Sequence, residues 1–205
     1  MIIEKQPRYF IVNKPPDMLS QFISERDAPL LGDINFDFPE GIHAIGRLDR
    51  QSEGLLILTT NKKVTRLLFQ GDVVHKRTYL VKVKNTVSEE KLQQLRNGIN
   101  IRIKGGDYYV TAACDAEIVN KPHEIFQPNI PLQEYPPFTW LKISLTEGKY
   151  HQIRKMTSAV HHRCQRLIRV SIEDLELGNL APGSVKEIEE RDFFTLLKID
   201  NWDKQ

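Results

Sequence analysis

The sequence has few cysteines, no phosphate-binding glycine motif and no long apolar run, and each absence argues against a class of protein. The two cysteines, Cys114 and Cys164, lack metal-ligand spacing and are expected to be buried, reduced thiols rather than a disulfide. No glycine-rich turn has the spacing of a phosphate-binding or dinucleotide-binding loop. No apolar run approaches the roughly 20 residues of a membrane helix, and residues 1–8 contain no apolar signal-peptide core. We therefore expect a cytoplasmic protein with no membrane partner.

The charges are segregated along the chain, although the formal net charge is only +2. Residues 62–84 hold seven Lys or Arg against one acid, and residues 141–170 hold seven against one, with three histidines besides. Residues 171–205 hold nine acids against four bases. Two basic blocks favour an anionic partner such as nucleic acid, and the alternative is a set of solvated helix faces.

The hydrophobic pattern predicts more strands than helices. Strands are expected over residues 9–13, 55–59, 77–84, 99–103, 108–119, 138–146 and 165–172. Helices are expected over 61–71, 88–97, 150–160 and 191–197, with irregular connections over 20–40 and 120–137. Because many strands follow one another directly, the pattern predicts an α+β fold with a mostly antiparallel sheet, made of one domain or two small lobes.

One carboxylate, Asp49, stands between Arg47 and Arg50 and precedes the turn-like Ser-Glu-Gly of residues 52–54. Nearby cations favour the ionised form of such a carboxylate at neutral pH, which suits a nucleophile or a charge stabiliser. The alternative is an exposed turn with ion pairs worth about 0–1 kcal/mol. Taken alone, the charge pattern favours the exposed turn.

A second segment, residues 145–156, joins an expected strand to a basic helix. A helix N-terminus attracts phosphate through its free N–H groups, and Lys149 and Lys155 add charge there. Arg154 lies next to the apolar stripe of this helix, so it is either a surface residue or half-buried toward a cleft. In a cleft it would pair bidentately with a carboxylate such as Asp49.

Tyr79 is the third candidate. A strand tyrosine that faces a cleft stacks on an unpaired base for about 1–3 kcal/mol, whereas most strand tyrosines belong to a core. The histidines His151, His161 and His162 have no carboxylate or cysteine at metal-binding spacing, so no metal site is expected.

Five segments then follow one another in a shared order: VNKPP at 12–16, GRLD with SEGLL at 46–56, TYLV at 78–81, EGK with HQIR and Met at 147–156, and residues 167–183. In these motifs the chain resembles the pseudouridine synthases of the ribosomal small-subunit type, a branch that also contains the large-subunit synthases B, E and F. The resemblance covers about residues 8–195, nearly the whole chain.

The resemblance implies that Asp49 is the catalytic carboxylate of an RNA-modifying isomerase. Tyr79 would pack on the target base, Arg154 would hold Asp49, and Leu167 would line the base pocket. The implied fold is a single catalytic domain over residues 1–205, with two lobes flanking a central cleft and no cofactor. The expected RNA-binding residues are Arg47, Arg50, Lys76, Arg77, Lys149, Gln152 and Lys155.

Three positions depart from the family pattern. Arg77 replaces a lysine, Ile168 a histidine, and Glu173 a glycine. There is also no room before Tyr9 for the small S4-type RNA-binding domain that many relatives carry, which points to the synthase E group within the branch. The expected partner is then 23S ribosomal RNA, bound by a monomer.

Three other functions remain open from the sequence. The first is a non-catalytic RNA-binding or ribosome-assembly protein on the same fold, and the second is a synthase that acts on 16S ribosomal RNA or transfer RNA. As a third alternative, a nucleoside or glycoside hydrolase using Asp49 would need a second carboxylate roughly 5–10 Å away. Glu53 is the nearby candidate in the sequence.

Overall fold

The computed structural model describes residues 6–69, 73–103, 105–122, 137–200 and 202. The chain forms two compact units, residues 1–75 with 171–205 and residues 76–170. The elements of each unit combine strands with short helices, as an α+β fold requires. Most of the irregular connection expected over 120–137 lies outside the described residues, as does the end of the helix expected over 61–71.

Strands β1 (Tyr9–Lys14) and β3 (Glu53–Thr59) form the centre of the first unit. They pair antiparallel, and β1 pairs on its other edge with β11 (Val185–Ile188). The short strand β2 (His43–Ile45) pairs with β3. Every residue of β1 and β3 is buried, which explains why these strands appear in the sequence as continuous apolar runs rather than as alternating patterns.

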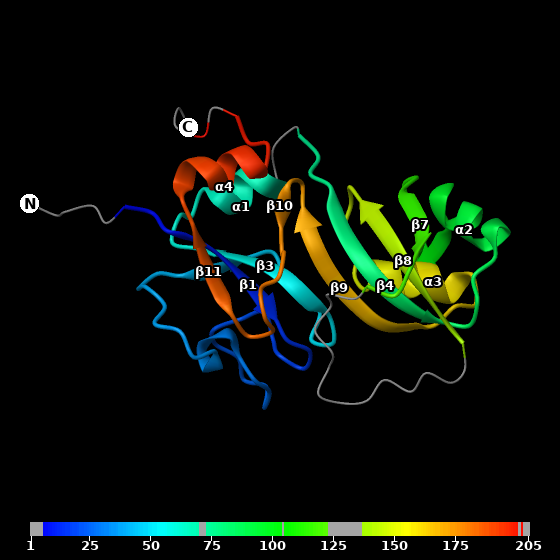
Figure 1. Cartoon of the computed structure of the whole chain (residues 1–205), viewed down its shortest axis with the longest axis horizontal. Coiled ribbons are helices and arrows are strands. Elements are labelled where there is room, and N and C mark those ends of the chain that lie inside the picture. The colour runs from blue at the N-terminus through cyan, green and yellow to red at the C-terminus, as the bar shows by residue number, and fades with distance from the viewer. Residues whose placement is uncertain (1–5, 70–72, 104, 123–136, 201, 203–205) are drawn as a thin grey trace, which may run out of the picture. The chain divides into compact units, whose positions relative to one another are not determined.

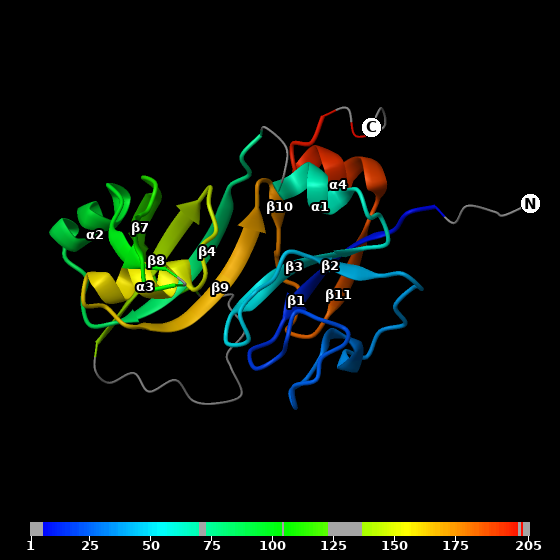
Figure 2. The ribbon, with the colours of Figure 1, turned by 180° about the vertical axis from the view of Figure 1, so that it is seen from behind.

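Two helices pack in the first unit, α1 (Val64–Phe69) and α4 (Glu190–Leu196). They lie side by side in both views of the ribbon (Figures 1 and 2). Helix α4 reaches the sheet through Phe193 and Phe194, whose ring centroids lie 4.6 and 5.4 Å from that of Tyr9. These aromatic contacts place the acidic C-terminal segment of the chain against β1.

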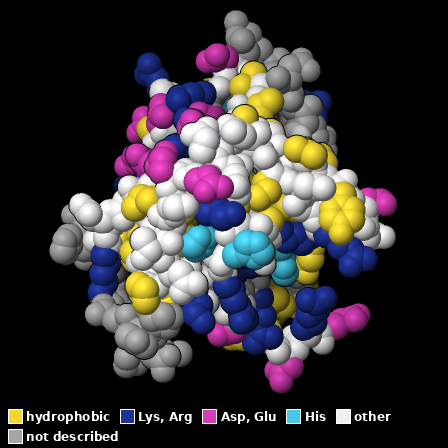
Figure 3. All heavy atoms as spheres, turned by 90° about the vertical axis from the view of Figure 1, so that its right-hand side faces the viewer, with side chains coloured by type: hydrophobic (Ala, Val, Ile, Leu, Met, Phe, Trp, Pro, Cys, Tyr) yellow, Lys and Arg dark blue, Asp and Glu magenta, His cyan; other side chains and the backbone are white. Residues whose placement is uncertain are grey.

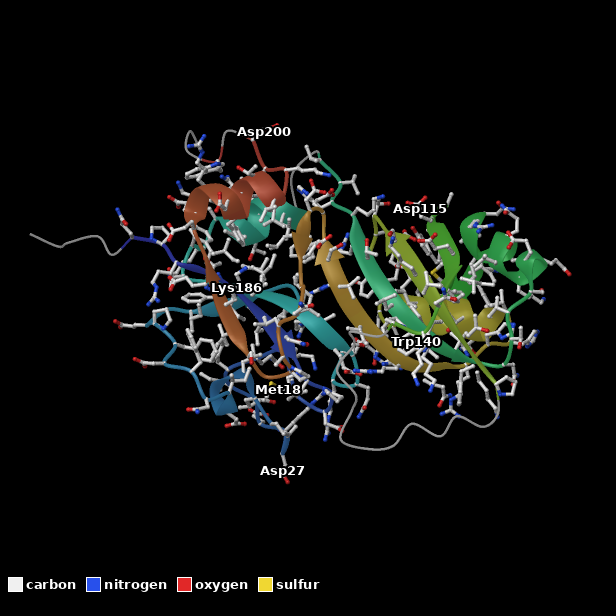
Figure 4. The ribbon with its side chains drawn as sticks, viewed as in Figure 1. Met18, Asp27, Asp115, Trp140, Lys186 and Asp200 are labelled. Carbon is white, nitrogen blue, oxygen red and sulfur yellow. The ribbon has the colours of Figure 1, made fainter. Side chains whose placement is uncertain are left out.

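The connection from β1 to β2 is irregular, as predicted, apart from one turn of 3-10 helix, η1 (Leu31–Asp33). Asp27 points away from the unit on this connection (Figure 4). Farther along, β10 (Leu175–Glu176) pairs with the last residues of β9 (Cys164–Ile172). Between them Glu173 has a φ of 49°, a left-handed conformation that glycine adopts most easily. That turn explains the glycine expected there.

The second unit is built on a sheet in the order β9–β4–β8–β7. Strand β4 (Arg77–Lys84) pairs antiparallel with β8 (Phe138–Leu145), and β8 pairs antiparallel with β7 (Asp115–Val119). Helix α3 (Gln152–Ala159) contributes its apolar side to the core of this unit. The sheet confirms the predicted antiparallel pairing of neighbouring strands.

Helix α2 (Glu89–Arg96) and the hairpin of β5 (Asn100–Arg102) and β6 (Tyr108–Val110) complete the second unit. Ser88 caps α2 by accepting a hydrogen bond from the Lys91 N–H, as its position in the sequence suggests. Gly98 ends the helix with a φ of 90°, and a Cβ there would lie 2.3 Å from the Thr111 carbonyl oxygen. No other residue fits this position without a backbone shift.

The prediction of a single strand over residues 108–119 is wrong, because the structure has two strands there. The chain leaves the β6 hairpin at Thr111, whose N–H donates to the Ile99 carbonyl at 3.0 Å. Cys114 then donates its N–H to the Arg96 carbonyl at the same distance, so the backbone turns before β7 begins. These partners lie on α2 and the segment after it, and no local pattern in the sequence indicates them.

Two helices begin later than predicted, and three strands were not predicted. Helix α1 begins at Val64 rather than at residue 61, although Asn61 still accepts a hydrogen bond from the Lys63 N–H. Helix α3 begins at Gln152 because His151 has a left-handed backbone, with a φ of 55°. The strands β2, β10 and β11 were missed, since each is short and defined by its pairing.

Candidate functional site

Asp49 lies in the loop between β2 and β3 of the first unit, with its side chain half-buried. Its carbonyl oxygen accepts a hydrogen bond from the Ser52 N–H at 2.9 Å, which closes a tight turn. The preceding residue, Leu48, is held by Ser20, whose Oγ accepts from the Leu48 N–H at 3.0 Å and donates to the Leu48 carbonyl at 2.9 Å. Both residues are buried, so the core of the unit fixes this loop.

Lys14, the last residue of β1, also holds the loop. Its side chain is fully buried, and Nζ donates to the carbonyl oxygens of Pro15 at 2.7 Å, Met18 at 2.9 Å and Arg50 at 3.2 Å. Met18 lies in the turn after β1 (Figure 4). Since Arg50 directly follows Asp49, the Lys14 ammonium ties this turn to the backbone of the candidate catalytic loop.

Burial lowers the pKa of Lys14 to about 8, and the carboxylates of Glu53, Asp17 and Asp49 act in the opposite direction. The Lys14 ammonium is therefore close enough to interact with the Asp49 carboxylate. Lys14 was not among the site residues predicted from the sequence. The signal was its place in the VNKPP motif, a buried-strand end followed by two prolines.

Arg47 and Arg50, which flank Asp49 in the sequence, are both exposed. Arg50 Nε donates to the Asp17 carbonyl oxygen at 3.2 Å and lies 3.4 Å from the Asp17 carboxylate. The next residue, Gln51, donates to the same carboxylate. Arg50 therefore braces the loop from outside, and the binding of RNA by both arginines stays a prediction.

Tyr79 lies on β4 in the second unit, where it is half-buried and packs against the core that includes Val81 and Val83. Its hydroxyl oxygen accepts a hydrogen bond from Arg169 of β9, which is 5% exposed. Burial lowers the pKa of Arg169, and the bond to Tyr79 acts in the opposite direction. Arg169 thus orients the tyrosine ring, a role that the Leu-Ile-Arg motif at 167–169 did not reveal.

Arg154 lies on α3 and is half-buried, which is one of the two placements that the sequence left open. Its Nη1 lies 3.7 Å from the Sγ of Cys164. Cys164 is buried and the other cysteine, Cys114, is half-buried, and neither forms a disulfide. Burial raises the pKa of each thiol to about 11. Leu167 is 5% exposed and belongs to the core of this unit. Its contact with a target base stays a prediction.

The candidate residues are distributed over both units. Asp49 belongs to the first unit, whereas Tyr79, Arg154 and Leu167 belong to the second. The pairing of Arg154 with Asp49 therefore stays a prediction. Within each unit, a buried cation, Lys14 or Arg169, interacts with the candidate residue.

A closed network of hydrogen bonds fixes the loop before α3. The Glu147 carboxylate accepts from the Tyr109 hydroxyl, from the Ala112 N–H at 2.9 Å and from Gln152 Nε2 at 2.7 Å. The Gln152 Oε1 in turn accepts from the Lys149 N–H at 2.8 Å. Gln152 is 5% exposed and both ends of its amide are bonded, so the structure gives this predicted RNA-binding residue a positioning role.

Glu147→Gln is expected to destabilise the protein by about 1–2 kcal/mol, because it removes a charged acceptor of three hydrogen bonds in a partly exposed site. Burial raises the Glu147 pKa, but the bonds from Tyr109, Ala112 and Gln152 and the charge of Lys149 lower it overall. The charged acceptor therefore stabilises the fold above the ordinary carboxyl pKa, and this contribution is lost as the pH falls through the folded pKa. Urea unfolding at neutral and acidic pH measures both effects.

Glu117→Gln is the matched control for this experiment. Glu117 lies on β7, and its exposed carboxylate is 3.2 Å from Lys142. An exposed pair of this kind contributes about 0–1 kcal/mol. Equal losses of stability in the two variants would contradict the role assigned to Glu147.

The other predicted RNA-binding residues lie on the second unit. Lys76 is 3.2 Å from Asp115, and Arg77 donates to the Thr146 carbonyl at 2.9 Å. Lys149 is exposed and Lys155 half-buried. Figure 3 shows one face of the molecule on which Lys and Arg side chains gather around histidines. The basic blocks of the sequence thus supply surface charge that suits an anionic partner.

Among the described residues, no group of three or more His, Cys, Asp or Glu side chains is placed to hold a metal ion. The helices within the described ranges are too short or too polar to cross a membrane.

Comparisons with known proteins identify the family. A family model described as RNA pseudouridylate synthase matches residues 8–159. A Vibrio parahaemolyticus protein named ribosomal large subunit pseudouridine synthase E is 36% identical over 185 residues, which cover 89% of this chain and 74% of that protein. A Xanthomonas axonopodis pv. citri protein of the same name is 34% identical over 174 residues, which cover 84% of this chain and 89% of that protein.

Solved structures show the same fold. A crystal structure described as a pseudouridylate synthase matches with a TM-score of 0.76 at 24% identity, covering 95% of this chain and 75% of that one. A human protein described as RNA pseudouridylate synthase domain containing 1 matches with a TM-score of 0.58 at 16% identity, covering 94% of this chain and 84% of that one.

Proposed function

Because the chain belongs to the RNA pseudouridylate synthase family, we propose that it converts a uridine of large-subunit ribosomal RNA into pseudouridine. One observation carries the choice of RNA. Relatives that are 34–36% identical over 84–89% of this chain share the name ribosomal large subunit pseudouridine synthase E. The substrate is then a uridine in 23S ribosomal RNA, and the enzyme acts as a monomer in the cytoplasm, where ribosomes are assembled.

In the proposed reaction, the glycosidic bond between N1 and C1′ of the uridine breaks. The uracil turns within the site, and a new bond forms between C5 and C1′. The proton on C5 is then released, and N1 gains a proton. Because the leaving uracil becomes negative and the sugar positive, a single ionised carboxylate has a natural role. Asp49, in its rigid loop, attacks or stabilises the sugar or the base.

The other residues are proposed to hold the target nucleotide. A base within structured RNA must be flipped out to reach the carboxylate, which calls for a stacking aromatic ring and cations for the phosphates. Tyr79, oriented by Arg169, supplies the ring, and Arg154 positions Asp49. The phosphate contacts are assigned to the basic residues Arg47, Arg50, Lys76, Arg77, Lys149 and Lys155.

The test is release of tritium from C5-labelled RNA. Incubated with unmodified, protein-free 23S ribosomal RNA, the protein is expected to release one tritium per modified site, because C5 loses its hydrogen as the new bond forms. Labelled 16S ribosomal RNA and transfer RNA serve as substrate controls. Release from only one of these controls would make that RNA the substrate in place of 23S ribosomal RNA. No release from any RNA, including ribosomal particles, would refute the proposed enzymatic activity. Free uracil as product would indicate hydrolysis instead.

A further inference from the structure

Tyr150 is a large aromatic side chain that the core does not use. It lies just before α3 and is 62% exposed. Its ring stacks on that of His151, with centroids 3.9 Å apart and an interplanar angle of 20°. His151 itself has a φ of 55°, a conformation that costs a non-glycine residue about 1 kcal/mol or more. An exposed tyrosine ring that is stacked on a half-buried histidine with a strained backbone is a feature that packing of the unit does not explain.

Two lysines contact aromatic rings in this segment. Lys155 Nζ lies 5.2 Å from the centroid of the Tyr150 ring, and Lys149 Nζ lies 4.5 Å from that of Tyr109. The first turn of α3 contains no acid. The one acid in the sequence of residues 141–170, Glu147, accepts hydrogen bonds from Tyr109, Ala112 and Gln152. The surface around Tyr150 therefore combines an exposed aromatic ring with the positive charges of Lys149 and Lys155.

That combination fits single-stranded nucleic acid. Unpaired bases stack on exposed aromatic rings, and neighbouring cations hold the phosphates between them. A protein partner would instead need a contiguous apolar area for its buried contacts. The neighbours that Tyr150 contacts, His151 and Lys155, are a polar ring and a cation.

We propose that Tyr150 stacks on an unpaired base of the RNA substrate other than the target uridine, while Lys149 and Lys155 bind the adjacent phosphates. This inference rests on the proposed function and adds a requirement to it. The substrate must present a second unpaired nucleotide near its target, in addition to the base that is modified. The pair of Tyr150 and His151 forms the stacking platform, and the Glu147 network holds Lys149 beside it.

The experiment measures the affinity of the full chain for a protein-free RNA hairpin with an unpaired loop, taken from the large-subunit RNA. Tyr150→Ala is expected to weaken binding about tenfold, the loss of one stacked base. Tyr150→Phe keeps an aromatic ring and is expected to bind within about twofold of wild type. With a perfect RNA duplex of equal length, all three proteins are expected to bind equally.

Tyr108→Ala is the matched control, since Tyr108 is 72% exposed on β6 of the same unit, and among the described residues no aromatic ring or lysine lies over it. It is expected to bind the hairpin as wild type does. Lys149→Ala and Lys155→Ala are each expected to reduce the slope of log affinity against log salt by about 0.7, the release of one counterion from single-stranded RNA.

Wild-type affinity of Tyr150→Ala for the hairpin would overturn the inference, as would an equal loss in Tyr108→Ala or on the duplex. A loss seen with ribosomal particles but not with protein-free RNA would assign Tyr150 to a protein contact and also overturn it. These outcomes are independent of catalysis. Tritium release by the wild type tests the proposed function, so the two proposals fail separately.

Discussion

Asp49→Ala is expected to abolish tritium release from 23S ribosomal RNA, while the affinity for the RNA stays within about tenfold of wild type. The carboxylate is the group assigned to attack or stabilise the reacting sugar or base, and RNA affinity comes mainly from phosphate contacts made elsewhere. Asp49→Asn should have the same effect, because the amide preserves the shape of the side chain and removes its charge. Release is measured under single-turnover conditions with enzyme in excess.

Asp27→Ala is the control for general damage to the first unit. Asp27 points away from the same connection that carries Ser20, which holds the Asp49 loop (Figure 4). Its removal should leave tritium release unchanged. Measurable release by Asp49→Ala would refute the catalytic assignment, and loss of RNA binding together with release would leave Asp49 as a binding residue only.

Lys14→Met is expected to lower the rate of tritium release roughly a hundredfold while RNA affinity changes little. Methionine fills a similar volume but donates no hydrogen bond, so the carbonyl oxygens of Pro15, Met18 and Arg50 lose their shared donor. The backbone beside Asp49 then loses its tie to the turn after β1. A displacement of about 1 Å at a reacting group costs about 10²-fold in rate. Lys14 is thus a positioning residue for Asp49.

Lys186→Met is the matched control, an exposed lysine on β11 of the same unit (Figure 4). It should leave both the rate and the affinity unchanged. A rate for Lys14→Met equal to that of wild type would show that the backbone of the loop holds its position without the ammonium group.

The pH dependence of stability separates this role from simple packing. The folded pKa of Lys14, about 8, lies below its ordinary value of 10.5, so the unfolded chain binds more protons between these two values. The wild type therefore gains stability as the pH rises through this window, by at most about 1.4 kcal/mol per pH unit. Lys14→Met lacks this gain. Between about pH 7 and about pH 10, the urea midpoint of the wild type should therefore rise relative to that of Lys14→Met.

Much of the fold follows from local patterns. The apolar runs of β1 and β3, the alternation of β4 and the spacing in α3 were all predicted, because burial against a core leaves a periodic trace in the sequence. The errors have a common cause. The break between β6 and β7 depends on hydrogen bonds from Thr111 and Cys114 to distant carbonyls, and β11 exists as a strand because β1 accepts it as a neighbour.

The sequence by itself determined the family and the chemical identity of the candidate site. Asp49, Tyr79 and Arg154 stand in motifs whose residue types suit a charged transition state and a flipped base, and motifs are readable without a structure. The tertiary structure decided which groups support them. Lys14 and Arg169 are buried cations, and each has one partner far along the chain, Arg50 for Lys14 and Tyr79 for Arg169. Gln152 is a buried member of the Glu147 network. Burial and long-range hydrogen bonds depend on the folded core, so residue type alone does not reveal them.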